Sequence, residues 1–281
     1  MTEIKQIDRD APLSGASLYQ NMKQEYTESH FLSAGEVNAE GEMSLPILAS
    51  KIIDIATAHA NSLGIGNPDM PDTDMGWVLS RLTVEMERWP RADETYSITT
   101  WIEEWNRHFS LRCFCIADAG GSTLGYARTV WMVMNTRTRE NAGLSRLNLA
   151  PEMVSARECP IDRQAKHRTI VEAGNMENPP RNSLTATEET GSYRFRYCDI
   201  DFYRHVNTVR YIDLLLNRFP LERYDRDFIK RVELNFLHEA KYGTEVRILT
   251  SKSEENPELF NMALVSDDKT LLFARLLFAG R

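Results

Sequence analysis

Residues 81–98 begin RLTVEM, residues 231–248 begin RVELNF, and the two stretches align without a gap, each ending in isoleucine. Apolar and polar side chains alternate along both, which is typical of a strand with one buried face. A second pair follows, because residues 124–128 (LGYAR) are similar to residues 271–275 (LLFAR). The two halves of the chain therefore look like copies of one unit.

Each half shows the same order of elements. Helices are expected over residues 46–63, with Pro46 in the first turn and Gly64 at the end, and over residues 207–218. Strands are expected at 76–89, 94–105, 109–119 and 124–135, and again at 192–198, 231–240, 244–252, 259–265 and 270–278. A helix wrapped by a long antiparallel sheet, occurring twice, predicts an α+β tandem hot-dog fold.

The 281 residues exceed the usual size of one domain. Residues 142–190 contain four prolines and show poor periodicity, which is typical of a connecting segment. We therefore expect an N-terminal hot-dog domain at 1–145, a linker at 146–190 and a C-terminal hot-dog domain at 191–281. A linker of this length would let two sheets lie side by side instead of forming one mixed sheet.

Composition excludes several classes of protein. Hydrophobic residues make up 42% and charged residues 26%, as in an ordinary folded enzyme, and the net charge of -8 argues against a nucleic-acid surface. The four cysteines show no spacing typical of disulfides or zinc, which fits a reducing cytoplasm. The charged first residues and the lack of a run of about 20 apolar residues predict neither a signal peptide nor a membrane span. We expect a cytoplasmic protein.

Residues 197–207, YCDIDFYRHVN, run from the end of a strand through a polar turn into a helix. Free N–H groups and the positive end of the helix dipole can polarise a carbonyl and hold the oxyanion that forms when it is attacked. Asp201 and His205 flank this position, and we expect the backbone N–H groups near His205 and Val206 to hold the oxyanion. An aspartate before a helix is also a common cap, and both duties can coexist.

The motif D-I-D-x-x-x-H-V-N-T-V-R-Y-I at residues 199–212 resembles the signature of plant and bacterial acyl-acyl carrier protein (acyl-ACP) thioesterases. Residues 76–81 (GWVLSR), 88–90 (RWP) and 127–135 (ARTVWMVMN) are similar to the amino-terminal hot dog of that family. The resemblance implies an enzyme of fatty acid biosynthesis that hydrolyses fatty acyl-ACP to free fatty acid and carrier thiol. It also implies no cofactor, no metal, and an acyl carrier protein with a pantetheine-linked chain as partner.

By that resemblance Asp201, His205 and Glu239 fall on the catalytic positions of the family. Tyr203 stands where the family usually has asparagine, and we include it among the catalytic candidates. Ala240 stands where plant members often have cysteine, which argues against a thiol nucleophile at this position.

The direction of Glu239 is open from the sequence. By strict alternation it lies on the face opposite Val232, Leu234 and Phe236, and His238 is then the better candidate base. A bulge or strand end near residue 237 would turn Glu239 inward.

The internal alignment places Trp89 where the second half has Glu239, and Ser44 nearest to the place of His205. One active site on the second half is therefore expected, with the first half shaping the acyl pocket.

All five tryptophans lie in the first half, which suits an apolar pocket for a fatty chain. We assign Trp77 and Trp131 to that pocket and Val206 and Asn207 to substrate binding at the helix start. The tryptophans have an alternative role as ordinary core residues.

Residues 201–231 carry seven basic and five acidic side chains, a net charge of +2. Such a patch can steer an acidic carrier, although a solvated helix face explains it equally well. An acyl-CoA thioesterase, a hydratase of the same fold and a non-catalytic acyl-binding protein remain alternatives, the last because of Tyr203. Chain length, saturation and oligomeric state, including a homodimer, are open.

Overall fold

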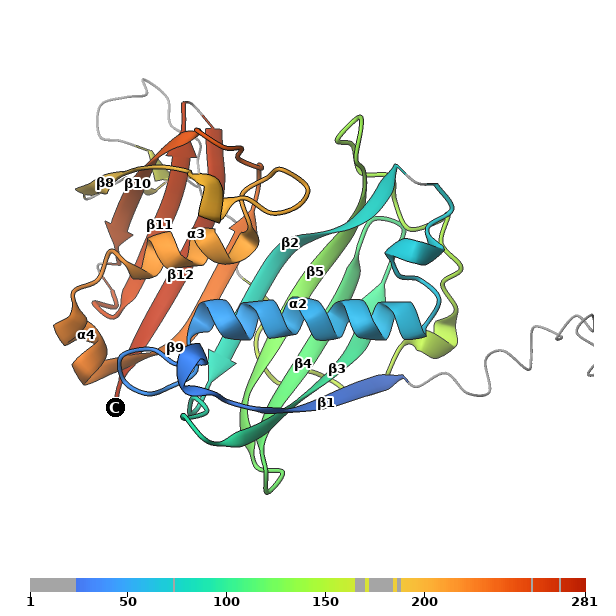
Figure 1. Ribbon diagram of the computed structural model, residues 1–281, viewed down its shortest axis with the longest axis horizontal. Helices are drawn as coiled ribbons and strands as arrows, with labels where there is room; N and C mark the ends of the chain where they lie inside the picture. The colour runs from blue at the N-terminus through green and yellow to red at the C-terminus, as the bar shows by residue number, and fades with distance from the viewer. Residues whose placement is uncertain are drawn as a thin grey trace, which may run out of the picture.

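One antiparallel sheet runs through the molecule, and the two principal helices lie on the same face of it (Figure 1). The structure is a computed structural model that describes residues 24–72, 74–164, 170–171, 184–185, 188–253, 255–267 and 269–281. Residues 1–23 of the expected N-terminal domain and most of 165–187 in the expected linker lie outside the described residues.

The expected succession of helices and strands is confirmed in both halves. The first half contains β1 (Glu25–Phe31), α2 (Leu45–Ser62), β2 (Met75–Met86), β3 (Thr95–Trp105), β4 (Ser110–Asp118) and β5 (Thr123–Asn135). The second contains β8 (Glu188–Arg194), α3 (Thr208–Leu216), α4 (Leu221–Arg226), β9 (Asp227–Phe236), β10 (Glu245–Lys252), β11 (Leu259–Ser266) and β12 (Lys269–Gly280). The sequence did not predict β1 or α4, and the strands expected at 192–198 and 231–240 end early, at Arg194 and Phe236.

The two half-sheets join edge to edge through β2 and β9. The strand order is β1-β3-β4-β5-β2-β9-β12-β11-β10-β8. Counted outward from the seam, β2-β5-β4-β3-β1 of the first half corresponds strand by strand to β9-β12-β11-β10-β8 of the second. Across the seam Arg81 pairs with Asn235, Thr83 with Glu233, and Glu85 with Arg231. This register is symmetric about the Thr83–Glu233 pair, as a gapless repeat of 81–98 at 231–248 requires. The half-sheets thus lie side by side as expected, but they form one continuous antiparallel sheet.

Helix α2 crosses the first half-sheet and contacts α3 (Figure 1). Ser44 precedes it, Pro46 occupies its first turn, and Gly64 ends it with a left-handed φ of 68°. Its buried side chains recur at helical spacing: Leu45, Leu48, Ala49, Ile52, Ile55, Ala56, His59 and Ala60. Six of these belong to a core cluster that also includes Leu82 and Val84 of β2 and their seam partners Leu234 and Val232 of β9, so one core spans both halves. Among the described helices, none combines the length and apolar character needed to cross a membrane.

The segment after β5 covers the other face of the first half-sheet. Along β4, Phe114 and Ile116 face the helix side, whereas Cys113 and Cys115 face the opposite side and pack with Cys159 and Ile161. Before it reaches that face, the segment packs Met153 against Ile102 of β3 and against Ala60 and Leu63 at the end of α2. The chain between the halves therefore closes a layer over β3 and β4 before the second half begins.

Candidate active site

The turn between β8 and α3 is held by the Asp201 carboxylate. Its Oδ1 accepts the backbone N–H of Tyr203 at 2.9 Å and of His205 at 3.1 Å, and the Asp201 N–H donates to the His205 carbonyl at 2.8 Å. Arg204 closes the turn with a left-handed φ of 68°. One oxygen of Asp201 thus fixes the backbone that presents the His205 ring, which explains why a short acceptor side chain is needed here.

The end of β9 turns Glu239 toward this ring. Leu237 and His238 both donate their N–H groups to the Leu271 carbonyl, at 2.9 and 3.2 Å, so the strict alternation of the strand stops there. Glu239 Oε2 then lies 3.4 Å from His205 Nε2. His238 is exposed, and its Nδ1 lies 2.8 Å from the Thr270 carbonyl. The neighbour of the His205 ring is therefore Glu239 and not His238.

The first half contributes a cation to this group. Arg139, in the loop after β5, forms an ion pair with Glu239. Burial lowers the pKa of His205 from its ordinary value of 6.5, and the nearby positive charges of Arg139 and Lys241 lower it further, against the opposing effect of Asp201. This shift of the pKa favours the neutral form of the ring. Sequence reasoning missed Arg139, since it lies in an irregular loop far along the chain from the motif.

The expected oxyanion donors are occupied in the structure. The His205 N–H donates to Asp201, and the Val206 N–H donates to the Ala240 carbonyl at 2.9 Å, so the assignment of these two groups to the oxyanion is wrong. Further into the helix, Asn207 accepts the N–H of Val209 on its side chain and that of Arg210 on its carbonyl.

A helix leaves its first N–H groups without intrahelical partners, so some of them remain available to a ligand. In the first turn of α3, the Thr208 N–H has no acceptor among the residues that the structure describes.

The remaining predicted site residues take varied positions. Tyr203 is 56% exposed, with its ring 3.9 Å from that of Phe202 between centroids, so it lies at the rim. Val206 is buried in the main core and Asn207 caps α3. Trp131 packs against the main core, and Trp77 packs in a satellite cluster while its Nε1 donates to the Ile65 carbonyl at 2.7 Å.

The turn before α2 repeats this turn bond for bond. Asn38 Oδ1 accepts the N–H groups of Glu40 and Glu42 at 3.2 and 2.9 Å, the Asn38 N–H donates to the Glu42 carbonyl at 2.7 Å, and Gly41 has a φ of 71°. The first-half counterpart of His205 is therefore Glu42, and the assignment of Ser44 to that place is wrong. Ser44 corresponds to the cap residue Asn207.

The strand-end segments repeat as well. The Met43 N–H donates to the Pro90 carbonyl at 2.8 Å, as Val206 does to Ala240, which places Trp89 at the position of Glu239. The sequence alignment, which placed Trp89 where the second half has Glu239, agrees with this correspondence.

Within the described residues, no group of three or more His, Cys, Asp and Glu side chains is arranged to hold a metal ion. The turn before α3 itself presents a histidine, a carboxylate at 3.4 Å and a helix start.

These features define a tandem hot-dog protein with a histidine–carboxylate pair at the start of α3. Residues 23–146 match the family of the acyl-ACP thioesterase N-terminal domain, and residues 182–277 match that of the acyl-ACP thioesterase C-terminal domain. The chain belongs to the acyl-ACP thioesterase family.

Similar proteins include the chloroplastic acyl-[acyl-carrier-protein] hydrolase FATB3 of Cuphea viscosissima, 26% identical over 80% of this chain and 54% of that protein. The chain spans about half the length of such curated relatives. An acyl-ACP thioesterase from Bacteroides thetaiotaomicron has a similar structure, with 26% identity, a TM-score of 0.78, and coverage of 91% of this chain and 98% of that chain. The 12:0-ACP thioesterase from Umbellularia californica shares the fold, with a TM-score of 0.75 and 19% identity over 92% of this chain and 98% of that chain. The predicted family and hot-dog fold are confirmed.

Proposed function

We propose that this chain hydrolyses fatty acyl-ACP thioesters to free fatty acid and carrier thiol at the turn before α3. The observation that carries the proposal is the contact between His205 Nε2 and Glu239 Oε2, at 3.4 Å, beside the start of a helix. Both side chains are partly exposed, at 22% and 40%, so water reaches them. The family match and the names of the relatives support acyl-ACP as the substrate.

The proposed reaction begins with water beside the pair. Water gives a proton to the His205–Glu239 pair as its oxygen attacks the thioester carbonyl carbon, and the Thr208 N–H stabilises the oxyanion. The carbon–sulfur bond then breaks, and the pair returns its proton to the departing thiolate. A thiol has a pKa near 8.5, so thiolate is a good leaving group and this assistance suffices.

Asp201 has a positioning role in this scheme. One of its oxygens is held by two backbone N–H groups, and its second oxygen is available to orient water or substrate. Tyr203 lies at the rim and belongs to the entrance, where it meets the pantetheine arm. We also propose a division of roles along the chain: residues 1–145 form the acyl-chain half, 146–190 the linker and 191–281 the catalytic half. Trp77 and Trp131 line the acyl pocket in this proposal.

The carrier is proposed to dock around the turn. Of the seven basic residues counted in 201–231, at least four are in ion pairs with neighbours: Arg210, Arg223, Lys230 and Arg231. That patch is therefore largely neutralised. The rim of the site is better suited, because it exposes four aromatic rings and three basic side chains: Tyr197, Phe202, Tyr203, Tyr242, Arg196, Arg204 and Lys241.

The experiment is a panel of acyl-ACP and acyl-CoA substrates of graded chain length, with release of free thiol as the readout. We expect turnover of acyl-ACP that is lost in His205→Ala. Faster turnover of the CoA esters would assign the enzyme to acyl-CoA, and binding of acyl-ACP without thiol release would make the chain a non-catalytic acyl-binding protein.

A further inference from the structure

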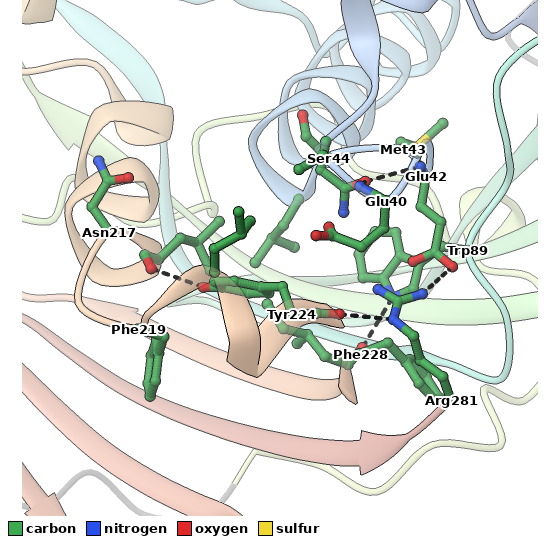
Figure 2. Close-up of a pocket in the computed structure, with 16 residues that line it drawn as sticks. Glu40, Glu42, Met43, Ser44, Trp89, Asn217, Phe219, Tyr224, Phe228 and Arg281 are labelled. Atoms are coloured by element: carbon green, nitrogen blue, oxygen red, sulfur yellow. Dashed lines mark hydrogen bonds and ion pairs between the residues drawn. The ribbon is translucent and has the colours of Figure 1, made fainter. Parts of the chain in front are cut away.

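A pocket lies at the opposite end of α3 from the candidate active site. Its volume is about 310 Å³, and it opens between the turn before α2, the end of α3, α4 and the start of β9 (Figure 2). Its walls are mostly apolar, and they include Met43, Trp89, Leu216, Phe219, Tyr224 and Phe228. Ligand pockets in proteins span about 300–1,000 Å³, so this one has the size for a short aliphatic chain.

This pocket occupies the place that the internal repeat assigns to a second active site. The turn from Asn38 to Ser44 lines it and has the same backbone hydrogen bonds as the turn that carries His205. In each place an arginine that follows the last strand of the other half reaches a carboxylate. Arg139 pairs with Glu239, and Arg281 pairs with Glu42.

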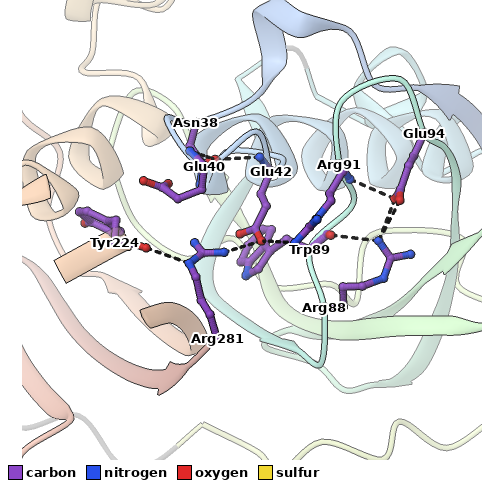
Figure 3. A network of polar contacts seen from close by, with 9 residues as sticks. All are labelled: Asn38, Glu40, Glu42, Arg88, Trp89, Arg91, Glu94, Tyr224 and Arg281. Atoms are coloured by element: carbon purple, nitrogen blue, oxygen red, sulfur yellow. Dashed lines mark hydrogen bonds and ion pairs between the residues drawn. The ribbon is translucent and has the colours of Figure 1, made fainter. Parts of the chain in front are cut away.

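The side chains of the turn from Asn38 to Ser44 cannot perform the proposed hydrolysis. Glu42 is only 5% exposed, and its Oε1 lies 2.5 Å from Arg281 and 3.9 Å from Arg91 (Figure 3). Asn38 has a carboxamide in place of the Asp201 carboxylate. Trp89 fills the position of Glu239, with its Nε1 donating to the Ile229 carbonyl at 3.0 Å. This described turn contains no histidine, and its Glu42 carboxylate is held by Arg281, so the histidine–carboxylate pair of the proposed hydrolysis is missing here.

One polar group of the pocket still requires a partner. Oε1 of Glu40 is buried and accepts no hydrogen bond from any described residue, and Figure 2 shows this side chain directed into the pocket. A buried acceptor without a donor is costly, so a ligand that brings an N–H or O–H group is favoured. A fatty carboxylate is disfavoured, because it would place a second negative charge beside Glu40.

We propose that this pocket is a second acyl-binding site, which holds a short aliphatic chain next to a hydrogen-bond-donating group and does not cleave it. An acyl group on a pantetheine-type arm has this chemistry, since its amides and hydroxyl are donors. This ligand class rests on the proposed function, because it extends the same substrate to the repeated turn.

The test is calorimetric titration of the full chain with S-octyl pantetheine, a thioether that cannot be hydrolysed. The wild type binds two equivalents. Glu40 and Tyr203 occupy equivalent positions of the two turns, so the backbone at position 40 accepts a tyrosine. In Glu40→Tyr the tyrosine ring fills the pocket. Leu216→Trp fills it from the end of α3, and Thr57→Tyr, on an exposed position of α2, is the matched control.

Both pocket variants weaken one of the two binding events by at least about tenfold, and hydrolysis of acyl-ACP keeps its rate and chain-length preference. Octanoate binds this pocket at least about tenfold more weakly than octanol, and Glu40→Gln narrows that difference. Wild-type stoichiometry and affinity in both pocket variants would overturn the inference. A changed chain-length preference would also overturn it, because the pocket would then belong to the substrate path.

Two bound equivalents without any hydrolysis by the wild type would refute the proposed function and leave the second site standing. The titration therefore tests the second site, and the thiol-release assay tests the proposed function, each independently of the other.

Discussion

Replacing Glu239 by glutamine separates a catalytic role from a structural one. Glu239 is 40% exposed and its contact with His205 is 3.4 Å long, so the contact and the ion pair with Arg139 are solvent-screened. Exposed pairs of this kind contribute about 0–1 kcal/mol to stability. A general base contributes about 10²–10⁴-fold to rate, which corresponds to about 3–5 kcal/mol of barrier. We therefore expect a large loss of kcat in a protein of nearly unchanged stability.

The assay is single-turnover hydrolysis of acyl-ACP, with urea unfolding measured on the same preparation. His238→Gln is the matched control, because His238 is the adjacent residue, is exposed, and among the described residues its ring is hydrogen-bonded to the Thr270 carbonyl. Its rate should equal that of the wild type. A loss of less than tenfold in Glu239→Gln with intact folding would refute the role of Glu239 in the proton transfer, and an equal loss in His238→Gln would assign that role to His238.

Three further perturbations test the geometry. Because burial and Arg139 lower the pKa of His205, the neutral ring persists below pH 6.5, so kcat/KM should fall only at lower pH, and Arg139→Met should move that limb upward. Arg281→Met leaves the buried carboxylate of Glu42 without its nearest cation and should destabilise the fold by about 3 kcal/mol in urea unfolding. Arg204→Gly relieves a left-handed backbone that costs about 1–2 kcal/mol and should raise Tm.

Each of these has a contrary outcome. An acid limb that stays in place in Arg139→Met would show that the loop does not act on the ring. Unchanged stability of Arg281→Met would show that Arg91, at 3.9 Å, suffices to neutralise Glu42. A lower Tm in Arg204→Gly would mean that the arginine side chain stabilises the turn by more than its backbone strain costs.

Much of the fold was predictable because local and repeated signals agree. Pro46 and Gly64 bracket α2, and the gapless repeat at 81–98 and 231–248 reappears as the symmetric pairing of Thr83 with Glu233. These features depend on backbone preference and on alternation, which a sequence displays directly.

The rest of the site depends on contacts that no local pattern encodes. The pairing of β9 ends where the N–H groups of Leu237 and His238 both donate to the carbonyl of Leu271, which belongs to β12. Arg139 meets Glu239 only after the half-sheets join. Glu42 was missed as the counterpart of His205 because α2 has 18 residues and α3 has nine, so an alignment anchored on the strands slips before the helices.

The paired turns have a consequence for how the two halves can diverge. In a dimer of identical chains, a substitution in one turn is necessarily present in both, so neither can lose its acid–base groups without the other. Joining two units in one chain removes that constraint. Asn38, Glu42 and Trp89 can then replace an aspartate, a histidine and a glutamate on one side only, and the turn that has lost these groups can hold a chain without cleaving it.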